Sequence, residues 1–358
     1  MKMISPRGIV TAMLAVIVLV AGCAQTRQVL RYETTPGAGT AVWPPPPEVP
    51  RYRFVGQLTG ERNFHDNREV SPNYVEKFFR WLVGLAAGRH IPVELQRPQA
   101  VWVAHDGRIY VTDVSRQGVF VFDPEAGRLE VWDLGDTPYA FQSPIGIVEG
   151  KSGEIIVADS GAGHLVRLNH RGELIEFFAG RDLGRPTGLS RDPATGELYV
   201  ADTQDHTVKV FSDAGQLQRT IGGRGEQPGK FNAPTYLAFQ DRKLYVTDTL
   251  NARIQILSPD GEVLGVFGRR GLFIGQMPRP KGVAVSRSGR IYVVESYYDH
   301  LLIFDADGRF LLPIGGSGSG VGQFYLPAGV FVDDSEKVYV ADMFNGRVVV
   351  LEFVGGGV

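Results

Sequence analysis

The sequence contains a single cysteine in 358 residues, and its 37 Lys and Arg nearly balance 39 Asp and Glu. One thiol excludes an internal disulfide framework and zinc sites built on several cysteines. Balanced charge excludes the global basic field that attracts nucleic acid, so we expect no nucleic-acid partner. The 45 glycines and 22 prolines are too many for a helical bundle and predict a protein rich in strands and turns.

An apolar run over residues 9–20 is too short to span a bilayer. Basic residues precede the run and small residues follow it, which is typical of a secretory signal peptide over residues 1–22. Residues 20–23, Val-Ala-Gly-Cys, resemble the bacterial lipobox. This resemblance implies cleavage before Cys23, lipidation of its thiol and a membrane anchor in the cell envelope. Because Ala24 is not acidic, it favours the periplasmic face of the outer membrane if the source is Gram-negative.

Residues 24–50 lack hydrophobic periodicity and contain four consecutive prolines at positions 44–47. Such a stretch favours an extended, semi-rigid backbone. We therefore expect residues 23–50 to form a lipidated spacer. A proline-rich ligand for an aromatic groove is the alternative interpretation.

One segment with the pattern Tyr-Val-x-Asp, or a close variant of it, occurs six times. The acidic residues that end these segments are spaced 46, 43, 46, 47 and 47 residues apart: Asp113, Asp159, Asp202, Asp248, Glu295 and Asp342. This period is that of a four-stranded propeller blade. In residues 282–314, tight turns at residues 288–289 and 307–308 separate the predicted strands.

Three features resemble NHL repeats over about residues 97–353: a proline before the first strand of each copy, the acidic strand end, and an Asn-x-Arg turn at Asn251 and Arg253. The resemblance implies an all-β fold, a six-bladed β-propeller of four-stranded antiparallel blades over residues 95–354. Asn-x-Arg recurs only at Asn345 and Arg347. The loop chemistry of the other copies therefore departs from the family pattern.

The sixth copy ends after its third strand, at Phe353, and lacks a fourth. Residues 51–58 alternate polar and apolar side chains, as a half-buried strand does. We expect residues 51–60 to pair with the strand around Val349 and to close the ring. Residues 61–94 then form one short helical insertion, with an amphipathic helix at 71–87 that either caps the propeller or contacts lipid or a partner protein.

Antiparallel order places the turns after the second strands and the connectors between blades on one face. The turns would bring together Arg116, His164, His206, Asn251, Arg253, Tyr297, Tyr298, His300, Phe344 and Arg347. The connectors would add Arg224, Arg269, Arg270, Leu272 and Phe273. Arginine and aromatic residues are typical of protein-binding hot spots. We expect this face of a monomeric body to bind a protein or a glycan.

The repeated acidic residues are expected to brace turns, since an active site needs an asymmetric set of roles. The residues after the strand-leading prolines contain no histidine or carboxylate: Gln99, Ile145, Thr187, Thr235, Lys281 and Ala328. The sequence thus predicts no catalytic residue, no metal ligand and no cofactor. A metal-dependent lyase or lactonase-like hydrolase with its site at the axis, using His164, His206 and His300, remains the alternative.

Overall fold

The structure is a computed structural model that describes residues 28–34, 41–66, 91–135, 137 and 139–355. Cys23, the signal sequence expected at residues 1–22 and the helix predicted at residues 71–87 lie outside these residues. Within the described ranges, no helix has the length and apolar character needed to cross a membrane.

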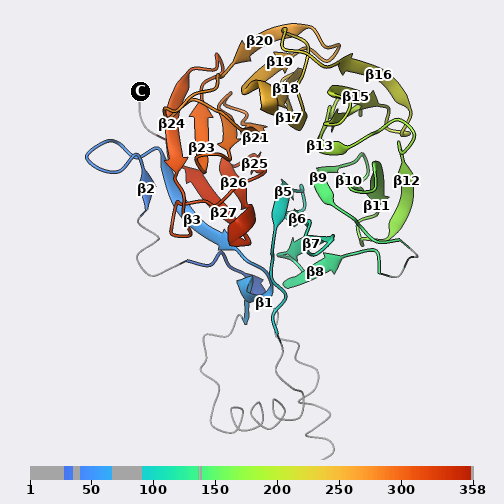
Figure 1. The fold of residues 1–358 in the computed structure, drawn as a ribbon. Coiled ribbons are helices and arrows are strands. Elements are labelled where there is room, and N and C mark those ends of the chain that lie inside the picture. Colours follow the sequence, from blue (N-terminus) through green and yellow to red (C-terminus); the bar gives the residue numbers. More distant parts are fainter. Residues whose placement is uncertain (1–27, 35–40, 67–90, 136, 138, 356–358) are drawn as a thin grey trace, which may run out of the picture.

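Six antiparallel sheets form a closed ring, as the repeat spacing predicts (Figure 1). In blades 1 to 5, four consecutive strands pair side by side with the first strand innermost. Blade 1 consists of β5 (Pro98–Val103), β6 (Ile109–Asp113), β7 (Gly118–Asp123) and β8 (Arg128–Trp132). Blade 2 consists of β9 (Pro144–Glu149), β10 (Ile155–Asp159), β11 (His164–Leu168) and β12 (Leu174–Phe178). Blade 3 consists of β13 (Pro186–Arg191), β14 (Leu198–Asp202), β15 (Thr207–Phe211) and β16 (Leu217–Gly222).

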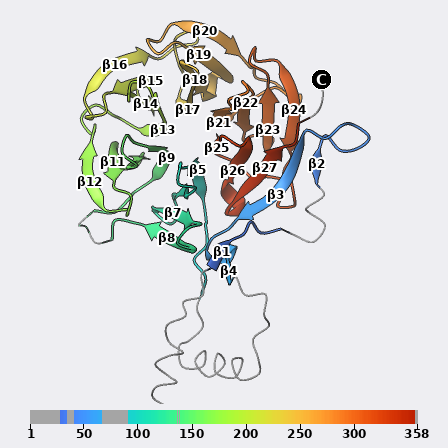
Figure 2. The same cartoon turned by 180° about the vertical axis from the view of Figure 1, so that it is seen from behind.

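Blades 4 and 5 repeat this arrangement, and Figure 2 shows the ring from behind. Blade 4 consists of β17 (Pro234–Gln240), β18 (Lys243–Asp248), β19 (Arg253–Leu257) and β20 (Val263–Phe267). Blade 5 consists of β21 (Pro280–Val285), β22 (Ile291–Glu295), β23 (His300–Phe304) and β24 (Phe310–Gly315). Short 3-10 turns, η3 (Thr249–Asn251) and η4 (Met343–Asn345), follow the second strands of blades 4 and 6.

Blade 6 joins the two ends of the described chain. Its C-terminal strands are β25 (Val330–Val332), β26 (Lys337–Asp342) and β27 (Arg347–Phe353), and its fourth strand is the N-terminal β3 (Tyr52–Leu58). Phe54 lies opposite Leu351, and Gln57 lies opposite Val349. The predicted closing strand is therefore confirmed. A fifth strand, β2 (Val42–Trp43), pairs outside β3 and was not expected.

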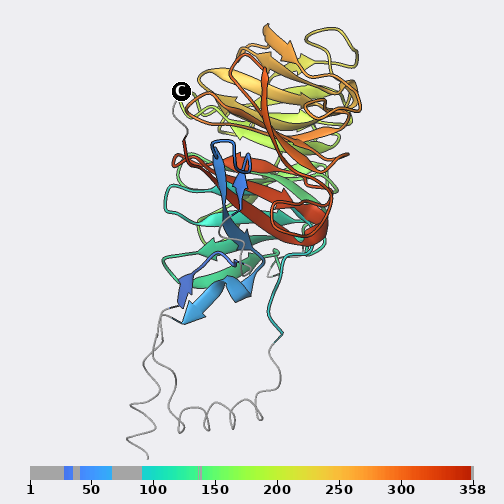
Figure 3. The same cartoon turned by 90° about the vertical axis from the view of Figure 1, so that its left-hand side faces the viewer.

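Much of the expected spacer packs against the propeller instead of extending away from it. β1 (Gln28–Leu30) pairs with β4 (Phe64–Asp66), which follows the short 3-10 turn η2 (Glu61–Asn63). Trp43 packs on the core between blades 5 and 6, and Tyr32 on that between blades 6 and 1. Burying these aromatic rings is more favourable than leaving them in water, which holds both segments on the propeller. The proline-rich stretch at residues 44–47 is therefore a connection between β2 and β3. Figure 3 shows these N-terminal strands beside the ring viewed edge-on.

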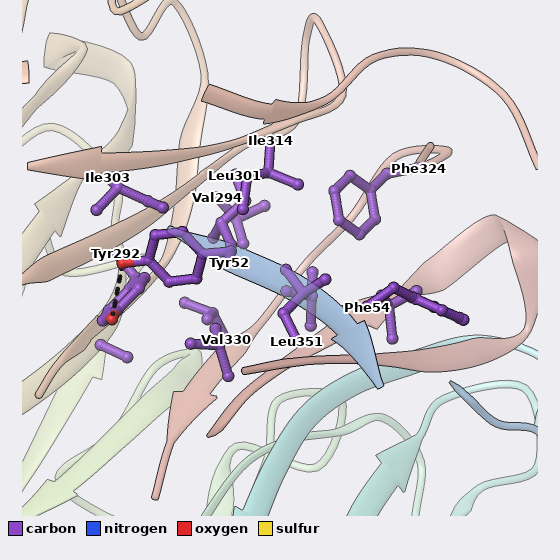
Figure 4. Close-up of a cluster of buried hydrophobic side chains, with 14 residues drawn as sticks. Tyr52, Phe54, Tyr292, Val294, Leu301, Ile303, Ile314, Phe324, Val330 and Leu351 are labelled. Carbon is purple, nitrogen blue, oxygen red and sulfur yellow. Dashed lines mark hydrogen bonds between the residues drawn. The ribbon is translucent and has the colours of Figure 1, made fainter. Parts of the chain in front are cut away.

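The propeller has a separate apolar core between each pair of neighbouring blades. Six clusters of buried side chains occupy the six interfaces. In the cluster between blades 5 and 6, Tyr52 and Phe54 of β3 pack among residues of β22, β23 and β26 (Figure 4). The Tyr52 and Tyr292 hydroxyls lie 3.2 Å apart. Each blade is thus stabilised chiefly by its neighbours, as repeat architecture requires.

Candidate functional site

One face of the ring collects the starts of the inner strands, the turns after the second strands and the connectors between blades. The registers set this geometry, because Pro98 pairs with Asp113, Pro186 with Asp202, and Pro280 with Glu295. We call this surface the loop face. It is the face on which the sequence places the candidate residues.

The repeated acidic residues are structural braces of the loop face. Asp113 accepts hydrogen bonds from the backbone N–H groups of Gln96, Arg97, Ser115 and Arg116 at 2.6–3.0 Å. Asp159 does the same in blade 2, and Glu295 accepts three such bonds in blade 5. A carboxylate that ties a strand start to a turn in this way is held in place by backbone.

Arg253 and Arg347 serve the interior rather than the exposed surface expected of them. Arg253 Nε lies 2.7 Å from Asp248 Oδ2, and Arg347 Nε lies 2.8 Å from Asp342 Oδ2. Their side chains are only 12% and 10% exposed. Asn251 donates to Asp248 and to the Gly225 carbonyl in the same network. These three residues hold connectors on the blades, and the hydrogen bonds and ion pairs that they form compensate the burial of the Asp248 and Asp342 carboxylates.

In blade 3, Lys209 provides the cation for the buried carboxylate of Asp202. The comparison of Asn-x-Arg turns did not identify this residue. Its ammonium lies 2.8 Å from Asp202 Oδ2 and also contacts Asp205. Burial alone raises the pKa of Asp202, but Lys209 and the backbone N–H groups of Gly184 and Arg185 hold it below its usual range. The ion pair therefore favours the folded state above the ordinary carboxyl pKa, and this contribution is lost as pH falls through the lowered value.

Three further candidates have local structural contacts on blades 1 to 3. Arg116 Nε donates to the Glu94 carbonyl at 3.0 Å, and His206 Nδ1 accepts the Ala233 N–H at 3.0 Å. The His164 ring packs against Phe177 at a centroid distance of 4.9 Å. His164 and His300 line different cavities. The structure therefore does not bring the candidate histidines together as a ligand set.

The remaining candidates gather over blades 4 to 6, where side chains that the sequence did not single out join them. We call this surface the apolar patch, and it consists of Leu250, Leu272, Phe273, Ile274, Tyr297, Tyr325 and Phe344, all of which are exposed. Leu272 and Phe273 are the most open, at 82% and 77% exposure. Isolated exposed apolar residues are ordinary, whereas three consecutive ones, residues 272–274, beside further exposed aromatic side chains mark a candidate interaction surface.

A sequence signal for the patch exists in the aligned connectors. Three connectors, those before blades 4, 5 and 6, share the glycine spacing Gly-x2-Gly-x3-Gly. Between the second and third glycines, the connector before blade 5 carries Leu-Phe-Ile at residues 272–274, whereas those before blades 4 and 6 carry Glu-Gln-Pro at 226–228 and Ser-Gly-Val at 319–321. Under this triplet lies a cavity of about 290 Å³, with Gln276, Tyr298, His300 and Ser317 among its lining residues. A cavity beside exposed apolar side chains suits the anchor residue of a partner.

The inner strands of neighbouring blades approach one another closely below the loop face. Gly146, Gly188, Gly282 and Gly329 each lie two residues after the proline that leads into the inner strand, where a Cβ would overlap the backbone of the next blade. Blade 4 has Tyr236 at that position, and its hydroxyl donates to the Gln99 carbonyl of blade 1 at 3.0 Å. Since blades 1 and 4 are opposite in a ring of six, this side chain crosses the axis.

The residues at the mouth of the axis do not fit the metal-dependent alternative. The described residues hold no group of three or more His, Cys, Asp or Glu placed to bind a metal. The second position of the inner strands offers one cation, Lys281, and neutral side chains. Burial, and then the nearby charge of Arg279, lower the pKa of Lys281. A divalent metal needs carboxylate, imidazole or thiolate ligands in place of these groups.

The chain matches two families of known proteins. Residues 99–314 match the family described as SMP-30/Gluconolactonase/LRE-like region, and residues 279–356 match one described as 6-bladed beta-propeller. NHL-repeat-containing protein 4 from Homo sapiens is 32% identical over 83 residues. That alignment covers 23% of this chain and 66% of the human protein, just under two thirds of its length.

Solved structures share the fold at low identity. Virginiamycin B lyase from Staphylococcus aureus with quinupristin has a TM-score of 0.55 at 15% identity, covering 75% of this chain and 85% of that one. A gluconolactonase from Xanthomonas campestris has a TM-score of 0.56 at 16% identity, covering 73% and 89%. A chain of a nidogen/laminin complex has a TM-score of 0.54 at 18% identity, covering 70% and 89%. The chain is therefore an NHL-like six-bladed β-propeller and belongs to the SMP-30/gluconolactonase/LRE-like family.

Proposed function

We propose that the protein is a membrane-anchored scaffold of the bacterial cell envelope that binds a partner protein through the apolar patch. The observation that carries this proposal is the Leu272-Phe273-Ile274 triplet, held open to solvent above a cavity. This connector buries Met277 at the position where the neighbouring connectors bury Phe231 and Phe324, so the exposed triplet is additional to the buried anchor that the three connectors share. The partner is expected to present apolar anchors with acidic residues around them, because Arg269 and Arg270 are exposed beside the triplet.

The proposed anchor would hold the propeller close to the membrane and leave the patch accessible. β1 begins at Gln28, five residues after Cys23. An extended link of this length reaches about 15 Å. β1 lies at the rim of the ring, so the proposed anchor would attach at the rim and not on the loop face (Figures 1 and 2). A partner protein in the same compartment could then approach the patch.

Replacement of Leu272 and Phe273 by serine should abolish most partner capture. Truncating two central apolar contacts costs an interface on the order of 2 kcal/mol or more, which weakens binding by at least about tenfold. The measurement is crosslinking and capture from envelope membranes with the full chain as bait, followed by affinity measurement with the protein recovered.

Matched control substitutions are available on the outer strands. Leu264 and Leu311 are also exposed apolar side chains, at 54% and 53%. They lie on β20 and β24, away from the loop face. The Leu264→Ser/Leu311→Ser variant should capture the partner as the unmodified chain does. Equal capture by the patch variant and this control would remove the patch from the proposal.

A further inference from the structure

We propose that the mouth of the propeller axis on the loop face binds a multivalent oxyanion of the phosphate or polycarboxylate kind. The site borders the apolar patch at Phe344, but binding there does not depend on a protein partner. Four basic side chains would bind the anion, and we call them the basic ring: Arg97, Arg185, Arg279 and Lys281.

The three arginines occupy equivalent positions in alternate blades. Each directly precedes the proline that begins an inner strand, in blades 1, 3 and 5. The corresponding residues of blades 2, 4 and 6 are neutral, namely Ser143, Ala233 and Leu326. In a closed ring of six blades, this alternation places the backbones of the three arginines at equivalent positions around the axis.

The backbone of each arginine is fixed by the acidic braces. The N–H groups of Arg97, Arg185 and Arg279 donate to Asp113, Asp202 and Glu295 at 2.8–2.9 Å. The carboxylates are thus held by backbone groups. The arginine side chains themselves are exposed on the loop face. Such rigid placement of flexible cations favours a bound anion, because little backbone ordering is needed.

None of the four cations has an ion-pair partner within the part of the chain that the structure describes. Arg185 Nε contacts only the Ser160 hydroxyl, at 3.3 Å, and the Arg97 guanidinium lies 5.1 Å from the Phe344 ring centroid. Lys281 is half-buried and is the second residue of β21, directly after Pro280. An ammonium held there without a counter-charge is destabilised, and an incoming anion would relieve this cost.

The Tyr236 side chain crosses the axis below the basic ring. The hydrogen bond from Tyr236 to the Gln99 carbonyl spans the ring just below the level of Lys281. An arginine side chain is about as long as that of tyrosine, so arginines of alternate blades can reach a shared ligand near the axis. Three guanidinium groups and one ammonium carry four positive charges, so a multivalent oxyanion, which also offers several oxygens to the bidentate guanidinium groups, matches them better than a monovalent one.

Calorimetric titration of the full chain in detergent with inorganic phosphate and, separately, with citrate tests the site. Binding of at least one of them, weakened about tenfold by Arg279→Gln and again by Lys281→Met, is the expected result. The anion that binds then identifies the ligand chemistry. The bound anion should also raise the Tm of the unmodified chain. It should raise the Tm of the Arg279→Gln/Lys281→Met double variant by less.

Arg270→Gln provides the matched control, because Arg270 is an exposed arginine of the loop face that donates to the Leu250 carbonyl away from the axis. Its affinity for the anion should equal that of the unmodified chain. Absence of binding by both anions would overturn the proposal, as would affinities that Arg279→Gln and Arg97→Gln leave unchanged. The Leu272→Ser/Phe273→Ser variant should retain the anion, so this result is independent of partner capture.

Discussion

Phe54→Ala should lower the free energy of unfolding by about 4 kcal/mol, the cost of removing a fully packed aromatic side chain. Phe54 is 4% exposed and belongs to the cluster that joins blades 5 and 6. It also lies on β3, the strand that closes the ring through β27. Weakening this contact therefore loosens the junction between the N-terminal and C-terminal parts of the chain. Chemical denaturation of the purified chain measures the change.

The same substitution at an exposed phenylalanine is the control. Phe273 is 77% exposed, so Phe273→Ala should leave the unfolding midpoint almost unchanged. Hydrogen exchange locates the effect: in Phe54→Ala, amides of β27 should exchange faster, while those of β15 in blade 3 should not. Uniform acceleration in both strands would contradict the role of β3 as a local closing strand.

Arg347→Ala should lower the free energy of unfolding by about 3 kcal/mol, because it leaves the buried Asp342 carboxylate without its cation. Arg347 lies 2.8 Å from Asp342 and 3.0 Å from Gln57 of β3, and it donates to the Ser319, Gly320 and Gln323 carbonyls. The side chain therefore ties together blade 6, the closing strand and the connector before the blade. Denaturant titration provides the measurement.

An exposed arginine gives the comparison for this prediction. Arg309 is 76% exposed and pairs with Asp305 and Asp307 on a turn between strands. Arg309→Ala should cost less than about 1 kcal/mol, as exposed ion pairs do. Partner capture should be equal in Arg309→Ala and in folded Arg347→Ala. A stable Arg347→Ala variant that loses its partner would instead restore Arg347 to the binding face.

Some equivalent positions of the propeller have the same role in every blade, and others differ from blade to blade. The acidic strand ends keep the same structural role in all blades, whereas the connectors differ in chemistry. The connector between blades 4 and 5 carries the apolar triplet. Blades 1, 3 and 5 carry the arginines that precede the inner strands. Function in such a ring is expected at positions where one copy departs from the others, since repeated positions maintain the shared fold.

The sequence by itself determined the number of blades, the braces and the closing strand. These features depend on local patterns, such as the spacing of Asp113 and Asp159 or the alternation in residues 51–58, and local patterns persist in any packing. Only the tertiary structure decided which polar residues are buried and which apolar ones are exposed. Arg347 meets Gln57 across 290 residues of sequence, and Tyr236 meets Gln99 across 137. Exposure and burial depend on such distant neighbours, which ring closure brings together and which no short stretch of sequence specifies.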